Sequence, residues 1–312
     1  MVGRAIVRRL ASEPVTLVTP KDRIDFRRQA ETEAWMAAQK PHVVFLAAAR
    51  VGGILANDNA PAQFLYDNLM IEANLIEAAR RTGVEKLVFV GSSCIYPKDA
   101  AQPITEDALL SGPLEPTNQW YAVAKIAGIK LAQAYRREYG CDFISAQPTN
   151  LYGPFDNFDL TASHVIPALM RKAHEAAQSG EPLVVWGSGR PFREFMHVDD
   201  LADALVFLAQ TWSGEDIVNV GSGEEVSIAD LAGMIARIAG LSGAPVFDAS
   251  KPDGTPRKLV DVSRLKAMGW NRARALAPGL QDTYEWFLNH RQSVRGYADA
   301  PSTRQKQDDQ QL

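Results

Sequence analysis

Cysteine is scarce in this chain: its 312 residues include two, Cys94 and Cys141. Two cysteines cannot form the disulfide framework of a small secreted domain, and such scarcity is typical of a reducing compartment, so we expect a cytoplasmic protein.

Long apolar runs are lacking as well. The longest, such as 43–49, reach about seven residues, whereas a membrane-spanning helix needs about 20, so we expect no membrane span.

A strong excess of charge of either sign is also absent. Lys and Arg number 33 against 37 Asp and Glu, which gives a net charge of −4. This balance provides no general attraction to nucleic acid or to an anionic membrane, so we expect small molecules as partners and no nucleic acid. The Arg-rich first ten residues lack the apolar stretch and cleavage signal of a targeting peptide.

Short apolar runs alternate along the first half of the chain with segments of helical period. The runs lie at 15–18, 42–48, 86–90 and 143–146, and the helical segments at 26–39, 62–82 and 119–139. This alternation predicts βαβ units and an α/β fold with a doubly wound parallel sheet. The runs are apolar at nearly every position, as expected when helices cover both faces of the sheet.

The second half of the chain predicts a smaller, mixed α/β lobe. Gly and Pro become frequent from Pro148 onward. After that point we expect helices at 164–178 and 199–210 and a strand at 183–186, followed by segments that continue a mixed α/β pattern at 216–220, 227–239, 245–248 and 275–289. Residues 291–312 carry almost no apolar side chains, which predicts a disordered tail.

Two motifs carry chemistry. The first, YAVAK at 121–125, places Tyr121 and Lys125 on one face of a helix, where an ammonium favours the phenolate and lowers the pKa of Tyr from about 10. The second, GSSCIYP at 91–97, places Ser92 at the carboxyl end of an apolar strand, where open α/β sheets build their sites. Taken alone, a Tyr/Lys pair is more often a feature of a helix surface.

Together, a Ser at a strand end and Tyr-x-x-x-Lys about thirty residues later resemble the extended branch of the short-chain dehydrogenase/reductases. Further segments are similar to the GDP-L-fucose synthase family: LAAARVGGI at 46–54, EPTN at 115–118, PTNLYGP at 148–154, SHVIPAL at 163–169 and KPDGTPRK at 251–258. The resemblance covers residues 2–290. It implies an NADPH-dependent 3,5-epimerase and 4-reductase that acts on GDP-4-keto-6-deoxy-D-mannose, and a homodimer that pairs through helices near 62–82 and 119–139.

The resemblance also implies the catalytic residues. Epimerisation at C3 and C5, which flank the C4 carbonyl, needs a base on one face, an acid on the other and donors for the enolate oxygen. By resemblance Cys94 and His164 are the base and acid, Ser92 and Tyr121 hold the C4 oxygen, and Lys125 holds the nicotinamide ribose. As isolated residues, Cys94 is more often a core filler and His164 a helix cap. We interpret Cys141 and His197 as structural.

For the cofactor, the segment after the expected strand at 15–18 carries Lys21 and Arg23 and no acidic residue at its start, which favours NADP(H) over NAD. A solvated basic turn is the alternative interpretation of these two residues. The resemblance implies that the cofactor site is formed by Gly3, Lys21, Ala47, Ser92, Lys125, Pro148, Asn150, Leu151 and His164. On this basis residues 1–163 and 192–220 form the Rossmann-like NADP-binding domain, and 164–191 and 221–290 the nucleotide-sugar lobe.

Basic and aromatic residues of that lobe are candidates for the substrate nucleotide. They are Lys172, Trp186, Arg193, Lys251 and Arg257. Trp186 can stack on a base or sugar, and Arg193 can form a bidentate contact with a diphosphate. At the position of Lys172 many family members have Arg, so that contact loses its bidentate geometry here. We expect no metal site.

The start of the chain departs from the family pattern. Such domains open with a strand and a Gly-rich turn that binds a pyrophosphate, whereas here Gly3 leads directly into a helical pattern. We therefore expect a wrongly assigned start or a fragment that binds NADPH weakly and folds poorly. Two other functions stay open: a related nucleotide-sugar 4-epimerase or dehydratase, and a catalytically impaired or non-catalytic Rossmann-like binding protein.

Overall fold

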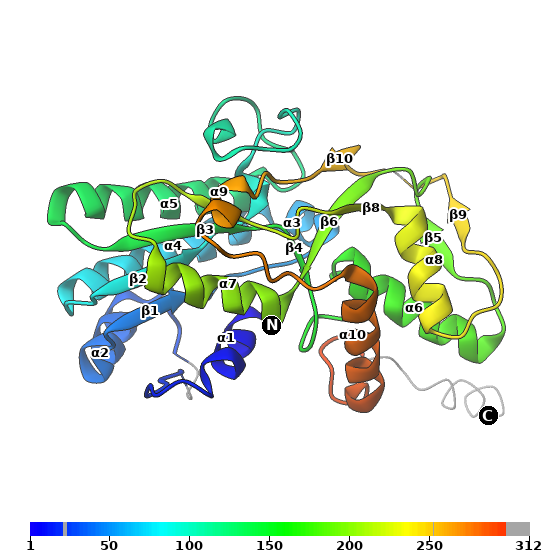
Figure 1. The fold of residues 1–312 in the computed structure, drawn as a ribbon, viewed down its shortest axis with the longest axis horizontal. Helices are drawn as coiled ribbons and strands as arrows, with labels where there is room; N and C mark the ends of the chain where they lie inside the picture. The colour runs from blue at the N-terminus through cyan, green and yellow to red at the C-terminus, as the bar shows by residue number, and fades with distance from the viewer. Residues whose placement is uncertain (21–23, 252, 298–312) are drawn as a thin grey trace, which may run out of the picture.

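The computed structural model describes residues 1–20, 24–251 and 253–297 (Figure 1). Its main sheet has four parallel strands in the order β1-β2-β3-β7. These strands are β1 (Val43–Leu46), β2 (Lys86–Val90), β3 (Phe143–Pro148) and β7 (Val218–Val220). The predicted doubly wound parallel sheet is confirmed, whereas Lys21 and Arg23 lie outside the described residues.

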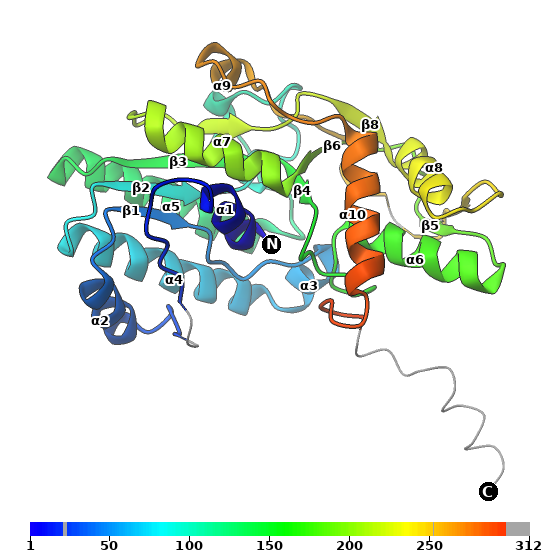
Figure 2. The same ribbon diagram turned by 60° about the horizontal axis from the view of Figure 1, so that its bottom comes forward.

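Helices cover both faces of this sheet, as Figure 2 shows. They are α1 (Val2–Leu10), α4 (Pro61–Arg81), α5 (Gln119–Tyr139) and α7 (Val198–Thr211). Alternate residues of β2 explain the two layers: Leu87 and Phe89 belong to the core cluster formed with α4 and α5, and Val88 and Val90 to the cluster formed with α1 and α7. All five residues of β2 are buried, which explains why the four after Lys86 are apolar, and Lys86 itself is paired with Asp142 at 2.8 Å.

The remaining elements form a second lobe with its own core, seen at the right of Figure 1. Its strands are β4 (Asn150–Tyr152), β6 (Phe192–His197), β8 (Glu225–Ser227) and β10 (Arg257–Lys258) in one sheet, and β5 (Val184–Trp186) and β9 (Val246–Asp248) in a parallel pair. Its helices are α6 (Val165–Ser179), α8 (Ile228–Ile238) and α10 (Leu276–His290). In the described part of the chain, no helix is long and apolar enough to cross a membrane.

Short elements connect these layers. Two of them, α2 (Gln29–Gln39) and α3 (Ile54–Asn59), pack near α4, and α9 (Ser263–Ala267) packs near β7. Two 3₁₀ turns, η1 (Ser93–Ile95) and η2 (Glu106–Ala108), follow β2. The turn η1 is the important one for function, because it lies at the carboxyl end of a central strand.

The strand predicted at 15–18 is wrong. The structure has irregular backbone there, and Val15 is 54% exposed. In the described residues β1 is the edge of the sheet, with Val43 45% exposed, and no strand lies beside it to pair with the segment 15–18. An apolar run becomes a strand only where a neighbour satisfies its backbone hydrogen bonds.

The boundary of the predicted tail also differs. Residues 291–297 form turns packed on the second lobe, where Val294 is buried. Arg171 of α6 donates to the carbonyl oxygen of Gly296 at 2.6 Å, and Phe158 N–H donates to that of Arg295 at 3.0 Å. The prediction of disorder is therefore wrong for 291–297, because one valine and several backbone contacts anchor a segment of low apolar content.

A further difference concerns the segment that follows β10. The prediction placed all of 221–290 in the second lobe, but Val260 and Val262 pack in the core cluster of α4 and α5. Leu265 and Trp270 pack in the cluster of α1 and α7. The chain therefore returns from the second lobe to the main sheet after Lys258, a crossing that hydropathy alone does not reveal.

Candidate active site

The carboxyl ends of β1, β2 and β3 meet at one edge of the sheet. Gln147 of β3 accepts a hydrogen bond from Ser92 N–H with its Oε1 at 3.1 Å, which fixes the loop after β2. A Cβ atom at Gly91 would lie 1.8 Å from that same oxygen. Glycine is needed at position 91 because the Gln147 side chain occupies the space of any larger residue.

Ser92, Cys94 and Tyr121 come together at this edge. Ser92 precedes η1, and its Oγ accepts a hydrogen bond from Cys94 N–H at 3.2 Å. Tyr121, near the start of α5, is hydrogen-bonded to the Ser92 side chain. The predicted grouping of hydroxyl, phenol and thiol is thus present around the end of β2.

The protonation of Tyr121 differs from the expectation. Burial raises the pKa of Tyr121 above its usual value, the negative charges of Cys94 and Glu72 raise it further, and the hydrogen bond from Ser92 offsets only part of this. The predicted lowering of this pKa by Lys125 is wrong in the structure, because the Lys125 charge is paired with Glu72. Tyr121 is therefore a protonated phenol, which is the form that donates a proton.

Lys125 is one turn after Tyr121 on α5 and is buried. Its Nζ donates to the carbonyl oxygen of Val90 at 2.9 Å and lies 3.0 Å from Oε1 of Glu72 on α4. The Nζ is 5.8 Å from the centre of the Tyr121 ring. Sequence reasoning missed Glu72, although it shares a helix face with the buried Leu75 and Ile76 three and four residues later.

Two donors face the thiol of Cys94. Nδ2 of Asn118, the residue before α5, lies 3.4 Å from Sγ, and Nζ of Lys258 in β10 lies 3.8 Å from it. The ammonium and the amide N–H both present hydrogen-bond donors to the sulfur. Sequence reasoning named neither residue for this role and chose Arg257, the neighbour of Lys258, for the substrate.

The backbone of β10 decides which cation reaches the thiol. Successive side chains of a strand point to opposite faces, so Arg257 pairs with Glu225 at 2.8 Å while Lys258 approaches Cys94. Lys258 lies opposite Arg193 of β6 in parallel register. Two residues later, Val260 N–H donates to the buried Glu194 at 3.1 Å, which holds this register.

His164 lies at the start of α6 and makes no side-chain cap there, so the helix-cap interpretation is wrong. Its loop is held against the loop after β1: Gly53 N–H donates to the Ala162 carbonyl at 3.0 Å, and a Cβ at Gly53 would lie 2.6 Å from the Ser163 carbonyl oxygen. Dehydration by the surrounding protein lowers the pKa of His164, although solvent still reaches its side chain. That its imidazole faces Cys94 stays a prediction.

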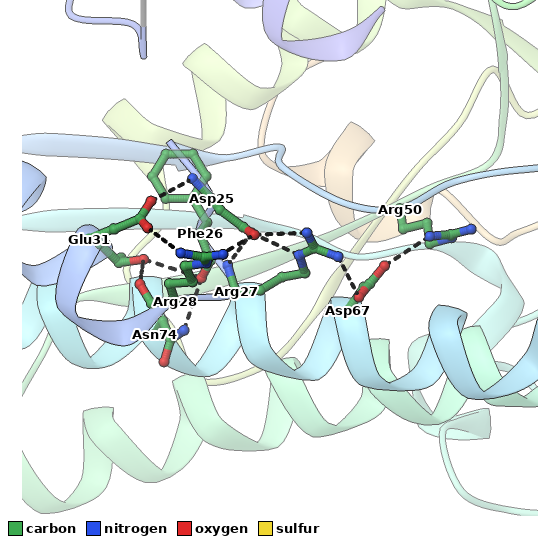
Figure 3. A network of polar contacts seen from close by, with 9 residues as sticks. Asp25, Phe26, Arg27, Arg28, Glu31, Arg50, Asp67 and Asn74 are labelled. Carbon is green, nitrogen blue, oxygen red and sulfur yellow. Dashed lines mark hydrogen bonds and ion pairs between the residues drawn. The ribbon is translucent and has the colours of Figure 1, made fainter. Parts of the chain in front are cut away.

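A charged network fixes the loop after β1, as Figure 3 shows. Asp67 of α4 bridges Arg27, at 3.1 Å, and Arg50, at 3.0 Å. Asn68 accepts from Arg50 N–H at 2.9 Å and donates to its carbonyl at 3.1 Å. Because Gly53 belongs to the same loop, this network indirectly supports the position of the loop that carries His164.

The residues expected to bind the cofactor surround the same edge. Ala47 follows β1, Pro148 ends β3, Asn150 and Leu151 lie in β4, and Gly3 lies in the first turn of α1, where no atom would contact its Cβ within 4 Å. Some buried polar atoms near this edge have no hydrogen-bond partner in the described structure: Gln147 Nε2, Asn118 Oδ1 and Ser163 Oγ. Unpaired donors and acceptors beside strand ends fit a polar dinucleotide and sugar.

The residues expected to bind the substrate divide into two groups. Lys172 and Lys251 both lie over the ring of Trp186, with Nζ 4.6 and 5.5 Å from its centroid. Arg193 lies on β6 beside Gly254, where a Cβ would approach its Nη2 to 2.8 Å. The fifth candidate, Arg257, is engaged by Glu225, and its contact with a nucleotide stays a prediction.

Two further expectations concern metal and histidine chemistry. Over residues 1–20, 24–251 and 253–297, no group of three or more His, Cys, Asp or Glu side chains is placed to hold a metal ion.

His197 accepts a hydrogen bond from Asp199 N–H at 3.2 Å and caps α7, and burial lowers its pKa to about 4. The structural interpretation of His197 is confirmed.

Comparison with known proteins gives a consistent result. Residues 1–221 match the model of the NAD dependent epimerase/dehydratase family. The GDP-L-fucose synthase of Sinorhizobium fredii is 58% identical over 292 residues, 93% of each chain, and that of Escherichia coli is 51% identical over 308 residues, 95% of this chain and 96% of the relative. The crystal structure of a GDP-L-fucose synthetase from Naegleria fowleri bound to NADP has a TM-score of 0.86 at 28% identity, covering 94% and 92% of the two chains.

Proposed function

The chain belongs to the NAD dependent epimerase/dehydratase family and, within it, to the GDP-L-fucose synthases, and we propose that it converts GDP-4-keto-6-deoxy-D-mannose to GDP-L-fucose with NADPH. One observation carries this proposal. A hydroxyl, a protonated phenol and a thiol with two N–H donors gather at the end of β2. A plain 4-reductase needs the first two groups, and the thiol adds the base for epimerisation.

NADP(H) fits the residues that are present, and bound NADPH supplies a hydride for C4 of the sugar. We place its nicotinamide ribose at Lys125, beside Ser92, and its remaining contacts at Ala47, Pro148, Asn150 and Leu151. Gly3 and His164 complete the proposed cofactor site, and Lys21 lies outside the described residues. The unpaired polar atoms at this edge, and the open first turn of α1, support this placement.

Epimerisation comes first, because the C3 and C5 protons are acidic only while C4 is a ketone. The Cys94 thiolate removes a proton, and the electron pair moves to the C4 oxygen, which accepts hydrogen bonds from Ser92 and Tyr121. Protonated His164 returns a proton to the opposite face of the carbon. Lys258 and Asn118 stabilise the thiolate that this step requires. The lowered pKa of His164 makes its protonated form a stronger acid, although fewer molecules carry it at pH 7.

Reduction follows at the same carbonyl. As hydride adds to C4, the phenol of Tyr121 gives its proton to the C4 oxygen, leaving a phenolate that takes up a proton from solvent before the next turnover. The raised pKa of Tyr121 supports this direction, because a group that stays protonated can act as the acid. Ser92 holds the same oxygen through both reactions, so the sugar need not change its position.

The substrate nucleotide binds in the second lobe. Trp186, between Lys172 and Lys251, supplies a flat apolar surface with positive charge beside it, which suits a base or sugar next to a diphosphate. Arg193 and Arg257 complete the proposed set. We assign 1–163 and 192–220 to cofactor binding and the other lobe to the substrate, with 259–270 packed on the main sheet.

We further propose a homodimer through α4 and α5. These helices pack on each other and also expose Tyr66, Trp120 and Val123. Exposed aromatic side chains on neighbouring helices are typical of an interface. A free thiol at the reaction centre favours a reducing compartment, which supports our proposal of a cytoplasmic enzyme.

The test uses the full chain, NADPH and GDP-4-keto-6-deoxy-D-mannose in D₂O. We expect one NADPH oxidised per sugar, with solvent deuterium at C3 and C5 of the product by NMR. Reduction without deuterium at these carbons would indicate a simple reductase. Turnover without net NADPH consumption would indicate a 4-epimerase or dehydratase, and nucleotide binding without turnover would indicate a binding protein.

A further inference from the structure

We propose that Glu72 is a positioning residue for the reduction step, acting through Lys125. This inference rests on the proposed function, because it concerns how the lysine of that site is held. Glu72 is on α4, outside every motif that the sequence analysis singled out, and its side chain points through the helix layer toward α5. Its carboxylate touches the lysine and not the site itself.

The contact between the two side chains is buried from solvent. Glu72 is 1% exposed and Lys125 2% exposed, and Oε1 lies 3.0 Å from Nζ. Among the residues that the structure describes, Lys125 is the cation in contact with Glu72, and neither carboxylate oxygen has a hydrogen-bond partner of good geometry. Burial raises the pKa of Glu72, and the charge of Lys125 opposes that effect. The carboxylate is therefore matched to this one ammonium.

Stability is a weak reason for such a pair. Removing two charges from water costs several kcal/mol for each ion, and apolar residues of similar volume are often as stable or more so. Here the pair lies beside Leu, Ile and Ala side chains of the core between the two helices, whereas their other polar contact, Tyr135 with Glu77, is only partly buried. A role in the reaction accounts for the position better than a role in folding.

The geometry leaves Lys125 one free direction. An ammonium has three N–H donors, and here one goes to the Val90 carbonyl while a second faces Glu72. The Phe89 ring covers another side, with its centre 4.7 Å from Nζ. The third donor remains for the cofactor ribose. Glu72 thus fixes where the ammonium points and places a carboxylate beside that buried nitrogen.

Gly128 makes room for this arrangement. It follows Lys125 by three residues on α5, and a Cβ there would lie 2.6 Å from Oε2 of Glu72 and 2.4 Å from the Phe89 ring. The absence of a side chain at 128 therefore lets the carboxylate reach the lysine. Gly128→Ala offers a second way to displace the carboxylate without changing its charge.

The pH dependence of the step involves few groups. The titratable side chains beside the ammonium are Glu72 from α4 and Tyr121 from α5, and Cys94 from the loop after β2 lies near Tyr121. Without the carboxylate, the buried ammonium loses its proton more readily, because dehydration favours the neutral amine. The rate of reduction should then fall at a lower pH than in the wild-type enzyme.

The experiment separates the two half-reactions. Hydride transfer is followed as NADPH oxidation, and epimerisation as deuterium uptake at C3 and C5 with NADP⁺ in place of NADPH. For Glu72→Gln we expect kcat for NADPH oxidation to fall about tenfold or more while deuterium uptake stays within about threefold. The alkaline limb of the rate profile should move to lower pH. Glu72→Asp should recover part of the rate, Gly128→Ala should resemble Glu72→Gln, and the exposed Glu85→Gln is the matched control.

Two results would overturn the inference. One is NADPH oxidation by Glu72→Gln within about twofold of wild type with an unchanged pH profile. The other is an equal loss of both half-reactions, which indicates a purely structural role. Failure of the proposed function is seen separately, because wild-type protein would then show neither NADPH oxidation nor deuterium uptake with this substrate.

Discussion

Removing the charge of Glu72 should destabilise the fold by an amount that depends on pH. Glu72→Gln leaves the Lys125 ammonium buried without a counter-charge, and breaking a buried pair in this way costs about 3–5 kcal/mol. The protein can limit this cost by folding with a neutral amine. Free lysine titrates near pH 10.4, so neutralising it at pH 7 costs about 4.6 kcal/mol, at 1.36 kcal/mol per pH unit.

The sign of the pH dependence follows from proton binding. In the variant the unfolded chain binds a proton at Lys125 that the folded, neutral form lacks, so stability rises with pH. At pH 9 the cost of neutralising the lysine, which is the upper limit of the stability loss, falls to about 1.9 kcal/mol. In the wild-type enzyme the Glu72 carboxylate balances the ammonium, so the cost of neutralising the amine does not arise. The deficit of Glu72→Gln relative to wild type should therefore shrink between pH 7 and pH 9.

Urea unfolding followed by fluorescence, at both pH values, measures this difference. A loss of 4 kcal/mol at pH 7 corresponds to a fall in melting temperature of about 6 °C if the 312 residues unfold together. The double variant Glu72→Gln/Lys125→Met should recover most of the loss, because it leaves no unpaired charge. A deficit that stays constant from pH 7 to pH 9, or a double variant weaker than either single one, would refute the reasoning.

Three other predictions concern the site directly. Lys258→Met removes the ammonium 3.8 Å from Cys94 Sγ, so alkylation of Cys94 by iodoacetamide at pH 7, followed by peptide mass spectrometry, should slow about tenfold; an unchanged rate would contradict its role. Gly91→Ala places a Cβ 1.8 Å from Oε1 of Gln147 and should cost about 1–3 kcal/mol in urea unfolding together with most NADPH oxidation; wild-type stability would show that the amide moves freely. Tyr121→Phe removes the proton donor and should lower NADPH oxidation about 100-fold or more, with a smaller loss of deuterium uptake; equal losses would argue against its role as the acid.

The sheet and its helices were predictable because their signal is local. After Lys86 every residue of β2 is apolar, and alternate members pack in two cores, so the run at 87–90 identifies a central strand without knowledge of its neighbours. The run at 15–18 is also mostly apolar but has no described partner strand, and it forms no strand. The local pattern indicates that a segment is able to form a strand, whereas the presence of a neighbouring strand decides whether it does so.

The site was predictable where a motif spans a few residues and not where its parts meet across the fold. Ser92, Cys94 and Tyr121 follow from two short segments. Lys258 lies 164 residues from Cys94, and it was passed over in favour of Arg257, whose side chain points the other way. Glu72 had a signal, an acid on the buried face of an otherwise apolar helix stripe, but nothing in the sequence names its partner.

The short strand β10 makes the reactivity of the thiol sensitive to chain length. Insertion or deletion of one residue in the segment that precedes it, with Val260 still anchored on Glu194, would leave the two cations in place. Deletion of Leu259 would instead move Arg257 to the position that faces Cys94 and turn Lys258 to the other face of the strand, whereas an insertion there would leave no cation from this pair facing the thiol. Changes in chain length should therefore be tolerated before Arg257, whereas a change between Lys258 and Val260 should inactivate the enzyme.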